Sequence, residues 1–175
     1  RYQGLVRLFG ERPGPGVWSR LAVVFQNPED LLFMPALLDD VALPLRNRGY
    51  DVTQARQMAQ LTLRSMGLEL YASEPTAHLS LGLRKRAALA AALSASPELL
   101  MLDEPTAELD GRSRRQLIGA IERLPGSVLL SSHDLELLER VVCRVLVLHE
   151  GVLVRDGPAA EVLLDRELLE RCGLI

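Results

Sequence analysis

The sequence predicts an α/β domain with a mainly parallel sheet. Two observations carry this prediction: short apolar runs alternate with stretches of helical periodicity, and several of these runs end abruptly at polar residues. At 175 residues the chain has the size of one domain. Hydrophobic residues make up 48% of the chain and aromatic residues only 4%, so we expect a core of Leu, Val and Ala.

Three apolar runs predict buried parallel strands, at residues 21–25, 99–102 and 128–130. Polar side chains follow them: Gln26 comes after the first run, Asp103 and Glu104 after the second, and His133 after the third. Ligands of parallel sheets bind at the carboxyl ends of the strands. We therefore expect these four side chains to converge on one edge of the sheet, which becomes the candidate active site.

Helices are predicted at residues 37–46, 52–66, 87–95, 111–124, 135–142 and 165–172, and a loop at residues 10–16. Asp51 or Thr53 can cap the second helix, and Gly67 can end it. The apolar runs 145–148 and 152–155 flank a Glu-Gly pair and predict a hairpin. No stretch approaches the roughly 20 apolar residues that are needed to cross a bilayer.

The polar residues at the strand ends suit phosphoryl transfer to water, in which positioning and electrostatics supply most of the catalysis. Neighbouring side chains on a strand face opposite ways, so Asp103 could hold Mg²⁺ while Glu104 acts on a water nucleophile. His133 could contact a phosphate oxygen or orient that water, and the Gln26 amide could bridge metal and water. Simpler interpretations remain open: a loop start after the strand, a helix cap at Asp134, and a surface glutamine.

The segment 79–86 carries a second set of features that favour an anion. Ser80 can cap the following helix, and Gly82 lets the backbone approach a ligand. The three cations at 84–86 lie near the same helix end, where they oppose the helix dipole unless an anion is close. The alternative is a solvated basic turn.

The composition argues against two classes of protein. A formal net charge of −3 argues against a general nucleic-acid binder, which would usually be basic. The two cysteines, Cys143 and Cys172, are far apart and form no CxxC pair. They are typical of inert thiols in a reduced protein rather than of a disulfide framework.

Taken together, these motifs closely resemble the ATP-hydrolysing subunits of ABC transporters over nearly the whole chain. The corresponding segments are a Q-loop at 25–28, a signature motif at 79–83, a Walker B strand at 99–104, a D-loop at 107–110 and a switch histidine at His133. Residues 25–33, 39–42 and 168–174 are similar to the energy-coupling-factor ATPases that power cobalt, nickel and vitamin uptake.

The resemblance implies one partial ABC ATPase domain over residues 1–175, with an incomplete P-loop NTPase-like parallel sheet core. Residues about 1–36 and 97–175 would form that core, and about 37–96 an inserted helical subdomain. It implies ATP and Mg²⁺ as cofactors. By carry-over, Glu104, His133 and Gln26 would be catalytic, Asp103 and Gln26 would hold the metal, and Ser80, Gly82 and Asp110 would contact nucleotide or partner at a dimer interface.

The implied partners are a membrane-spanning transporter subunit and a second ABC ATPase subunit, either identical or different, with no nucleic acid. The membrane subunit would dock just after Gln26. The protein would lie peripherally on the cytoplasmic face of the cell membrane as part of an importer. Two alternatives are a degenerate ABC domain that acts as a non-hydrolysing dimer partner, and a soluble ABC ATPase outside transport.

The sequence departs from the family in two places. A phosphate-binding loop needs Gly-Lys-Ser or Gly-Lys-Thr, and the only lysine, Lys85, lies in the signature region instead. We therefore expect the chain to start after that loop and to be inactive alone. In the signature, Leu81 and Leu83 stand in place of a glycine and a glutamine, and a bulky Leu81 is expected to slow catalysis.

Overall fold

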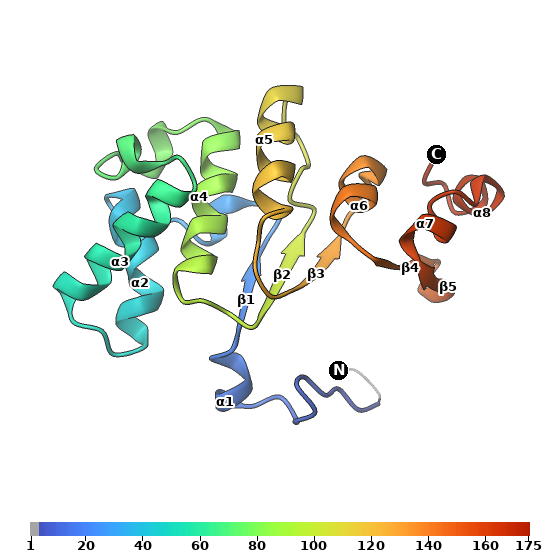
Figure 1. Cartoon of the computed structure of the whole chain (residues 1–175), viewed down its shortest axis with the longest axis horizontal. Helices are drawn as coiled ribbons and strands as arrows, with labels where there is room; N and C mark the ends of the chain where they lie inside the picture. Colours follow the sequence, from blue (N-terminus) through green and yellow to red (C-terminus); the bar gives the residue numbers. More distant parts are fainter. Residues whose placement is uncertain (1–3) are drawn as a thin grey trace.

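Three parallel strands form the predicted sheet in the computed structural model, which describes residues 4–175. Their bounds are β1 (Leu21–Val24), β2 (Leu99–Asp103) and β3 (Ser127–Ser131), in the spatial order β1-β2-β3. Val24 lies opposite Leu102, and Asp103 lies opposite Ser131. The carboxyl ends of the strands therefore share one edge (Figure 1), which confirms the α/β class with a parallel sheet.

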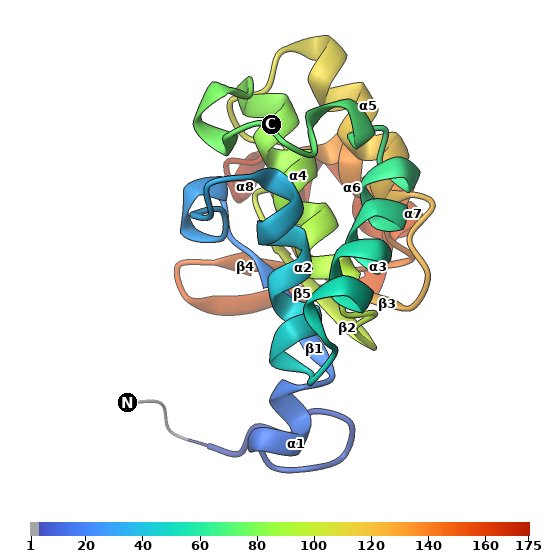
Figure 2. The ribbon, with the colours of Figure 1, turned by 90° about the vertical axis from the view of Figure 1, so that its left-hand side faces the viewer.

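Three helices connect β1 to β2 and pack against one another: α2 (Leu37–Asn47), α3 (Val52–Ser65) and α4 (Leu81–Ser94). They lie together on one side of the sheet (Figures 1 and 2). The Asp51 carboxylate accepts the Gln54 N–H and caps α3. Gly67 follows the end of this helix at φ +65°, in the left-handed region that glycine adopts without strain. Both features confirm the sequence prediction.

Helix α4 begins at Leu81, earlier than the predicted start at residue 87. The Ser80 hydroxyl accepts the Leu83 N–H at 3.4 Å and caps this start. Most of the alanine-rich part of α4 is buried, with Ala87, Ala88 and Ala90 each 0% exposed. Small side chains there let the other helices approach closely, so the composition of this helix follows from its central position.

The helices that follow β2 and β3 begin at aspartate caps. Helix α5 (Gly111–Ile121) is capped by Asp110, and α6 (Leu135–Val141) is capped by Asp134. Three short 3₁₀ helices lie in the connecting segments, at Pro28–Asp30, Glu69–Tyr71 and Thr76–His78.

The C-terminal part forms a second, antiparallel sheet. It contains β4 (Arg144–His149) and β5 (Val152–Pro158), the predicted hairpin, followed by α7 (Ala159–Val162) and α8 (Arg166–Arg171). This part has a small apolar cluster of its own, formed by Val145, Val147, Ala159, Val162 and Leu168. The short helix α7 was not predicted from the sequence. Cys143 and Cys172 are both free thiols, as expected.

Residues Pro15–Trp18 form a short helix, α1, which overlaps the segment predicted to be a loop. Pro15 occupies the first turn, where its fixed φ favours a helix and its missing N–H costs nothing. Figure 2 shows α1 projecting from the base of the sheet. The loop predicted at 10–16 is therefore wrong at its C-terminal end, where the helix begins at Pro15.

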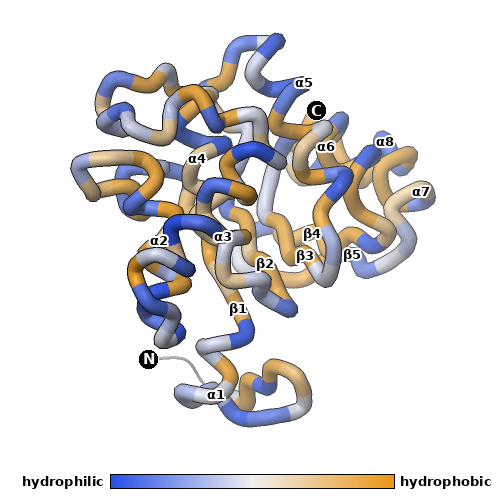
Figure 3. Tube along the Cα trace, turned by 60° about the vertical axis from the view of Figure 1, so that its left-hand side comes forward, coloured by the Kyte–Doolittle hydropathy of each residue, from blue (hydrophilic) through white to orange (hydrophobic). Residues whose placement is uncertain are grey.

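The main core lies between the three-stranded sheet and the helices that cover it. Its largest fully buried side chains include Leu37, Leu45, Leu63, Leu89, Leu117 and Ile118. Hydrophobic residues concentrate along the strands (Figure 3). Packing of these residues in the core holds the sheet, and with it the polar residues at the carboxyl ends of the strands, in position. No helix within residues 4–175 is both long enough and apolar enough to cross a membrane.

Candidate active site

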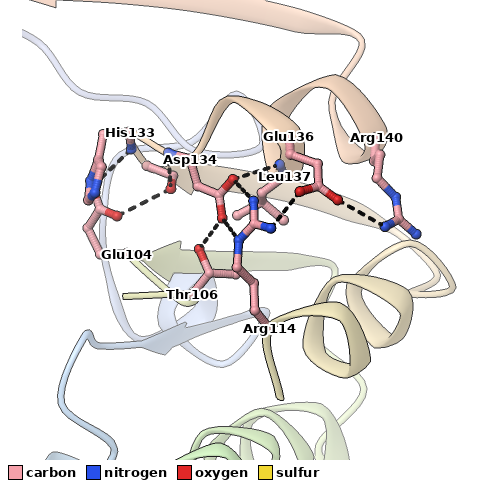
Figure 4. Close-up of polar contacts among 9 residues, drawn as sticks. Glu104, Thr106, Arg114, His133, Asp134, Glu136, Leu137 and Arg140 are labelled. Atoms are coloured by element: carbon pink, nitrogen blue, oxygen red, sulfur yellow. Dashed lines mark hydrogen bonds and ion pairs between the residues drawn. The ribbon is translucent and has the colours of Figure 1, made fainter. Parts of the chain in front are cut away.

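Glu104 and His133 meet where β2 and β3 end (Figure 4). The His133 ring Nδ1 lies 2.9 Å from Glu104 Oε1, and the His133 backbone N–H donates to the same oxygen at 3.1 Å. The Ser132 hydroxyl donates to Glu104 Oε2 at 3.2 Å. Three groups from one short segment thus hold both oxygens of the Glu104 carboxylate, and two of the predicted catalytic residues form one cluster.

The backbone of Glu104 takes an unusual conformation. Its φ of +41° falls in the left-handed region, which is uncommon for a residue that carries a side chain and is found at functional sites. The Glu104 N–H donates to the Ser131 carbonyl at 2.9 Å, which keeps the residue beside β3. This turn takes Glu104 out of the strand and toward the segment that contains His133.

Asp103 remains on the strand and has a different partner. Its Oδ1 accepts a hydrogen bond from the Ser131 hydroxyl at 2.5 Å, and the residue is exposed. Within residues 4–175, no three His, Cys, Asp or Glu side chains gather in a metal-binding group. One exposed carboxylate fits Mg²⁺ bound beside a nucleotide, because this ion takes one or two carboxylates and completes its shell with phosphates and water.

The Glu104 carboxylate raises the pKa of His133 above its ordinary value, through a hydrogen bond and through its charge. Both effects favour the protonated ring. The His133 side chain is 73% exposed, so it remains accessible from solvent. The arrangement places a carboxylate and a titratable imidazole together at the sheet edge.

Gln26 lies two residues beyond β1 and is exposed. Among the residues that the structure describes, its side chain forms no hydrogen bond with Asp103 or Glu104. The segment after it is tied to α4, because Glu29 Oε1 accepts a hydrogen bond from Arg84 Nη1 at 2.6 Å. The structure therefore places Gln26 at the expected end of its strand without joining it to the carboxylates.

Gly82 is buried where α4 meets α5. A Cβ atom added to Gly82 would lie 2.5 Å from Ser113 Oγ and 2.6 Å from Ser113 Cβ. The Ser113 hydroxyl donates to Asp110 Oδ2 at 2.7 Å, and this bond lowers the pKa of Asp110. Ser113 thus brings Gly82 and Asp110 close together. A side chain at position 82 would clash with Ser113, which explains the glycine without any ligand.

We expect Gly82→Ala to lower the free energy of unfolding by about 1–3 kcal/mol, the usual effect of an extra methyl group in a packed site. Adding Ser113→Gly should restore most of this loss, because it removes both clashing atoms. Urea unfolding measures each change. Gly119→Ala is the control: it lies in α5, and the nearest side-chain atom to its added Cβ is Arg123 Nη1 at 3.7 Å. A Gly82→Ala protein as stable as the control would contradict the packing.

The three cations at 84–86 have partners within the chain, which corrects the alternative of a solvated basic turn. Arg84 pairs with Glu29, and Arg86 donates to the Met66 carbonyl at 3.4 Å. Lys85 is only 6% exposed and donates to the Glu104 carbonyl oxygen at 3.3 Å. Burial lowers the pKa of Lys85. The lysine therefore supports the backbone of Glu104.

A second polar cluster surrounds Asp134, directly after His133 (Figure 4). Arg114 donates to both carboxylate oxygens of Asp134, with Nε 2.7 Å from Oδ2, and the Thr106 hydroxyl donates to Oδ2 at 2.8 Å. Asp134 Oδ1 also accepts the Leu137 N–H at 3.1 Å. These bonds, led by that from Arg114, lower the pKa of Asp134 to about 2. The cap predicted at Asp134 is confirmed, whereas its arginine partner was not predicted.

The chain is similar to proteins of one family along most of its length. Residues 11–107 match the family described as ABC transporter. A Gloeobacter violaceus protein assigned by name to the ABC transporter ATP-binding proteins is 42% identical over 156 residues, which are 88% of this chain and 64% of that protein. The chain thus spans less than two thirds of the length of that relative.

Two further similarities are to a transporter ATP-binding protein and to the solved structure of a transporter component. The energy-coupling factor transporter ATP-binding protein EcfA of Methanothermobacter thermautotrophicus is 35% identical over 159 residues, which are 89% of this chain and 51% of EcfA. The structure of CbiO1 from Clostridium perfringens, part of the transporter complex cbiONQ, superposes with a TM-score of 0.82 at 25% identity. This match covers 98% of this chain and 72% of CbiO1.

Proposed function

This chain belongs to the ABC transporter family of ATP-binding proteins, and on that premise we propose that Glu104 and His133 serve ATP hydrolysis in an energy-coupling-factor importer. The observation that carries the proposal is the Glu104 carboxylate, held by His133 and Ser132 at the end of the strand on which Asp103 is exposed. A fixed carboxylate at a strand end that also carries an exposed aspartate suits the activation of water beside a nucleotide phosphate.

In the proposed reaction, Glu104 accepts a hydrogen bond from the attacking water and orients this water toward the γ-phosphate of ATP. His133 keeps its Nδ1 contact with Glu104 and offers its other ring nitrogen, on a side chain that is 73% exposed, to a γ-phosphate oxygen. Asp103, with the Gln26 amide, would hold Mg²⁺, which neutralises negative charge on the phosphates when bound. Lys85 holds the Glu104 main-chain carbonyl and is buried, so it supports the backbone of Glu104 instead of reaching a phosphate.

We propose that a second ATPase subunit completes the site through Ser80, Gly82 and Asp110. Ser80 is exposed at the start of α4, and Asp110 is exposed at the start of α5. The contact between Gly82 and Ser113 keeps these two helix ends side by side. The N–H groups at the start of α4 suit a phosphate supplied across the interface.

The relatives support the transporter type. EcfA is an energy-coupling factor transporter ATP-binding protein, and CbiO1 is part of a transporter complex. We propose that this chain likewise binds a membrane-spanning subunit through the segment after Gln26. It would lie on the cytoplasmic face of the cell membrane, with cobalt, nickel or a vitamin as cargo.

A second candidate function is a non-hydrolysing dimer partner. The 175 residues contain no Gly-Lys-Ser or Gly-Lys-Thr, and Leu81 and Leu83 stand half-buried at the start of α4. We propose that these residues alone do not hydrolyse ATP. Activity is therefore to be measured on the protein expressed from its whole reading frame.

Uptake of radioactive cobalt and nickel, and of vitamins, by cells that carry Glu104→Gln separates the candidates. We expect the uptake of one cargo to fall to the level of a gene deletion, because transport needs hydrolysis at Glu104. Uptake that survives Glu104→Gln and is lost on deletion would favour the non-hydrolysing partner. Uptake that survives deletion would favour an ABC ATPase outside transport.

A further inference from the structure

Arg114 connects helix α5 to the segment that contains His133. Its guanidinium donates to both oxygens of Asp134, and Nη1 also donates to Glu136 Oε2 at 2.5 Å. The side chains of Arg114 and Asp134 are 26% and 12% exposed, so little water competes for this pair. A bidentate pair of this kind fixes orientation as well as distance.

The segment Ser132–Asp134 is held from two sides. On one side, the Ser132 hydroxyl and both His133 donors bind the Glu104 carboxylate. On the other side, Asp134 is held by Arg114 and Thr106. The Asp134 N–H donates to the Ser132 hydroxyl at 3.1 Å and joins the two sides within the segment. Displacing Asp134 would therefore move the donors that hold Glu104.

Arg114 also lies close to the start of α5. Its backbone N–H donates to the Asp110 carbonyl at 2.9 Å, in the first turn of the helix. The chain of contacts thus runs from Asp110 through Arg114 and Asp134 to His133. A shift of the start of α5 would therefore reach His133 through groups that are hydrogen-bonded to one another.

We propose that Arg114 is a positioning residue that keeps His133 paired with Glu104 by holding Asp134. It touches neither member of that pair. The proposal deepens the proposed function and rests on it for its catalytic meaning: a partner that engages Asp110 would reach the hydrolytic pair through Arg114.

Arg140, within α6, provides a matched control. It donates to Glu122 at 2.8 and 2.9 Å and lies 3.7 Å from Glu136. It therefore also joins α5 to α6 by charge, but it makes no bond to Asp134. A role in general stability would be shared by Arg114 and Arg140, whereas positioning of His133 belongs to Arg114 alone.

The test is the NMR titration of His133 in the 175-residue chain, without nucleotide, for the unchanged sequence and for Arg114→Met and Arg140→Met. Pairing with Glu104 raises the pKa of His133 above the ordinary value of 6.5. We expect Arg114→Met to bring it back toward 6.5 and Arg140→Met to leave it unchanged. A folded Arg114→Met chain with an unchanged His133 pKa would overturn the proposal.

Thr106→Val supplies a second arm, because it removes one hydrogen bond to Asp134 and keeps the ion pair. We expect a smaller fall in the His133 pKa, and no fall would count against the proposal even if Arg114→Met does not fold. In the protein from the whole reading frame, Arg114→Met should lower kcat by about 10- to 100-fold with little change in KM for ATP. If the unchanged protein hydrolyses no ATP, the proposed function fails while the titration still decides the positioning role.

Discussion

Replacing Asp134 by alanine is expected to lower the free energy of unfolding by about 3 kcal/mol. The change leaves Arg114 without its main partner in a half-buried position, and breaking such a pair costs about 3–5 kcal/mol when it is fully buried. It also removes the cap of α6. Urea unfolding of the two chains at neutral pH measures the difference.

The contribution of Asp134 to the free energy of unfolding also depends on pH in the acid range. The pKa of Asp134 is lowered to about 2 from an ordinary value of 3.8, so the unfolded chain binds more protons between these values. The stabilisation is present above pH 3.8 and is lost as the pH falls through 2. It amounts to about 2 kcal/mol at about 1.36 kcal/mol per pKa unit, and Asp134→Ala should lack it.

Asp51→Ala is the matched control for Asp134→Ala. Asp51 caps α3 by accepting the Gln54 N–H, and it forms no ion pair with an arginine in the described part of the chain. Loss of a cap alone costs about 1 kcal/mol. If Asp134→Ala costs no more than Asp51→Ala, the Arg114 pair adds nothing to stability and its structural role is refuted.

The strands and most of the helices were predictable because their signals are local. Apolar runs set β1–β3, and the caps at Asp51 and Ser80 follow from side chains that accept hydrogen bonds from N–H groups three residues away. The shared edge of Asp103, Glu104 and His133 followed from topology alone, since parallel strands end on the same side. The start of α4 was misplaced because its alanine content was given more weight than its cap.

The supporting contacts could not be predicted, because they join residues that are distant in the sequence. Arg114 and Asp134 are 20 positions apart, and only the packing of α5 beside α6 brings them together. In the sequence, Lys85 is part of a basic cluster. Its burial depends on how α4 packs beside Glu104, which the sequence does not reveal. The left-handed backbone of Glu104 carries no sequence signal, because such strain is stabilised by the surrounding fold.

Glu104→Gln is expected to reduce ATP hydrolysis by about 10²- to 10⁴-fold, the usual contribution of a positioned acid or base. Glutamine keeps the size of the side chain and its ability to accept a hydrogen bond, but it loses the charge that orients the water. The fall should therefore appear in kcat, while ATP binding is retained. Glu98→Gln is the control. Glu98 directly precedes the start of β2, at the end of the strand away from Glu104, and it pairs with Arg20.

The most direct test of the hydrolytic site is phosphate release from Mg²⁺-ATP by the protein expressed from its whole reading frame, with Glu104→Gln and Glu98→Gln measured beside it. We predict steady release by the unchanged protein and by Glu98→Gln, and almost none by Glu104→Gln. Equal release by all three proteins would contradict the assignment of hydrolysis to Glu104 at this sheet edge.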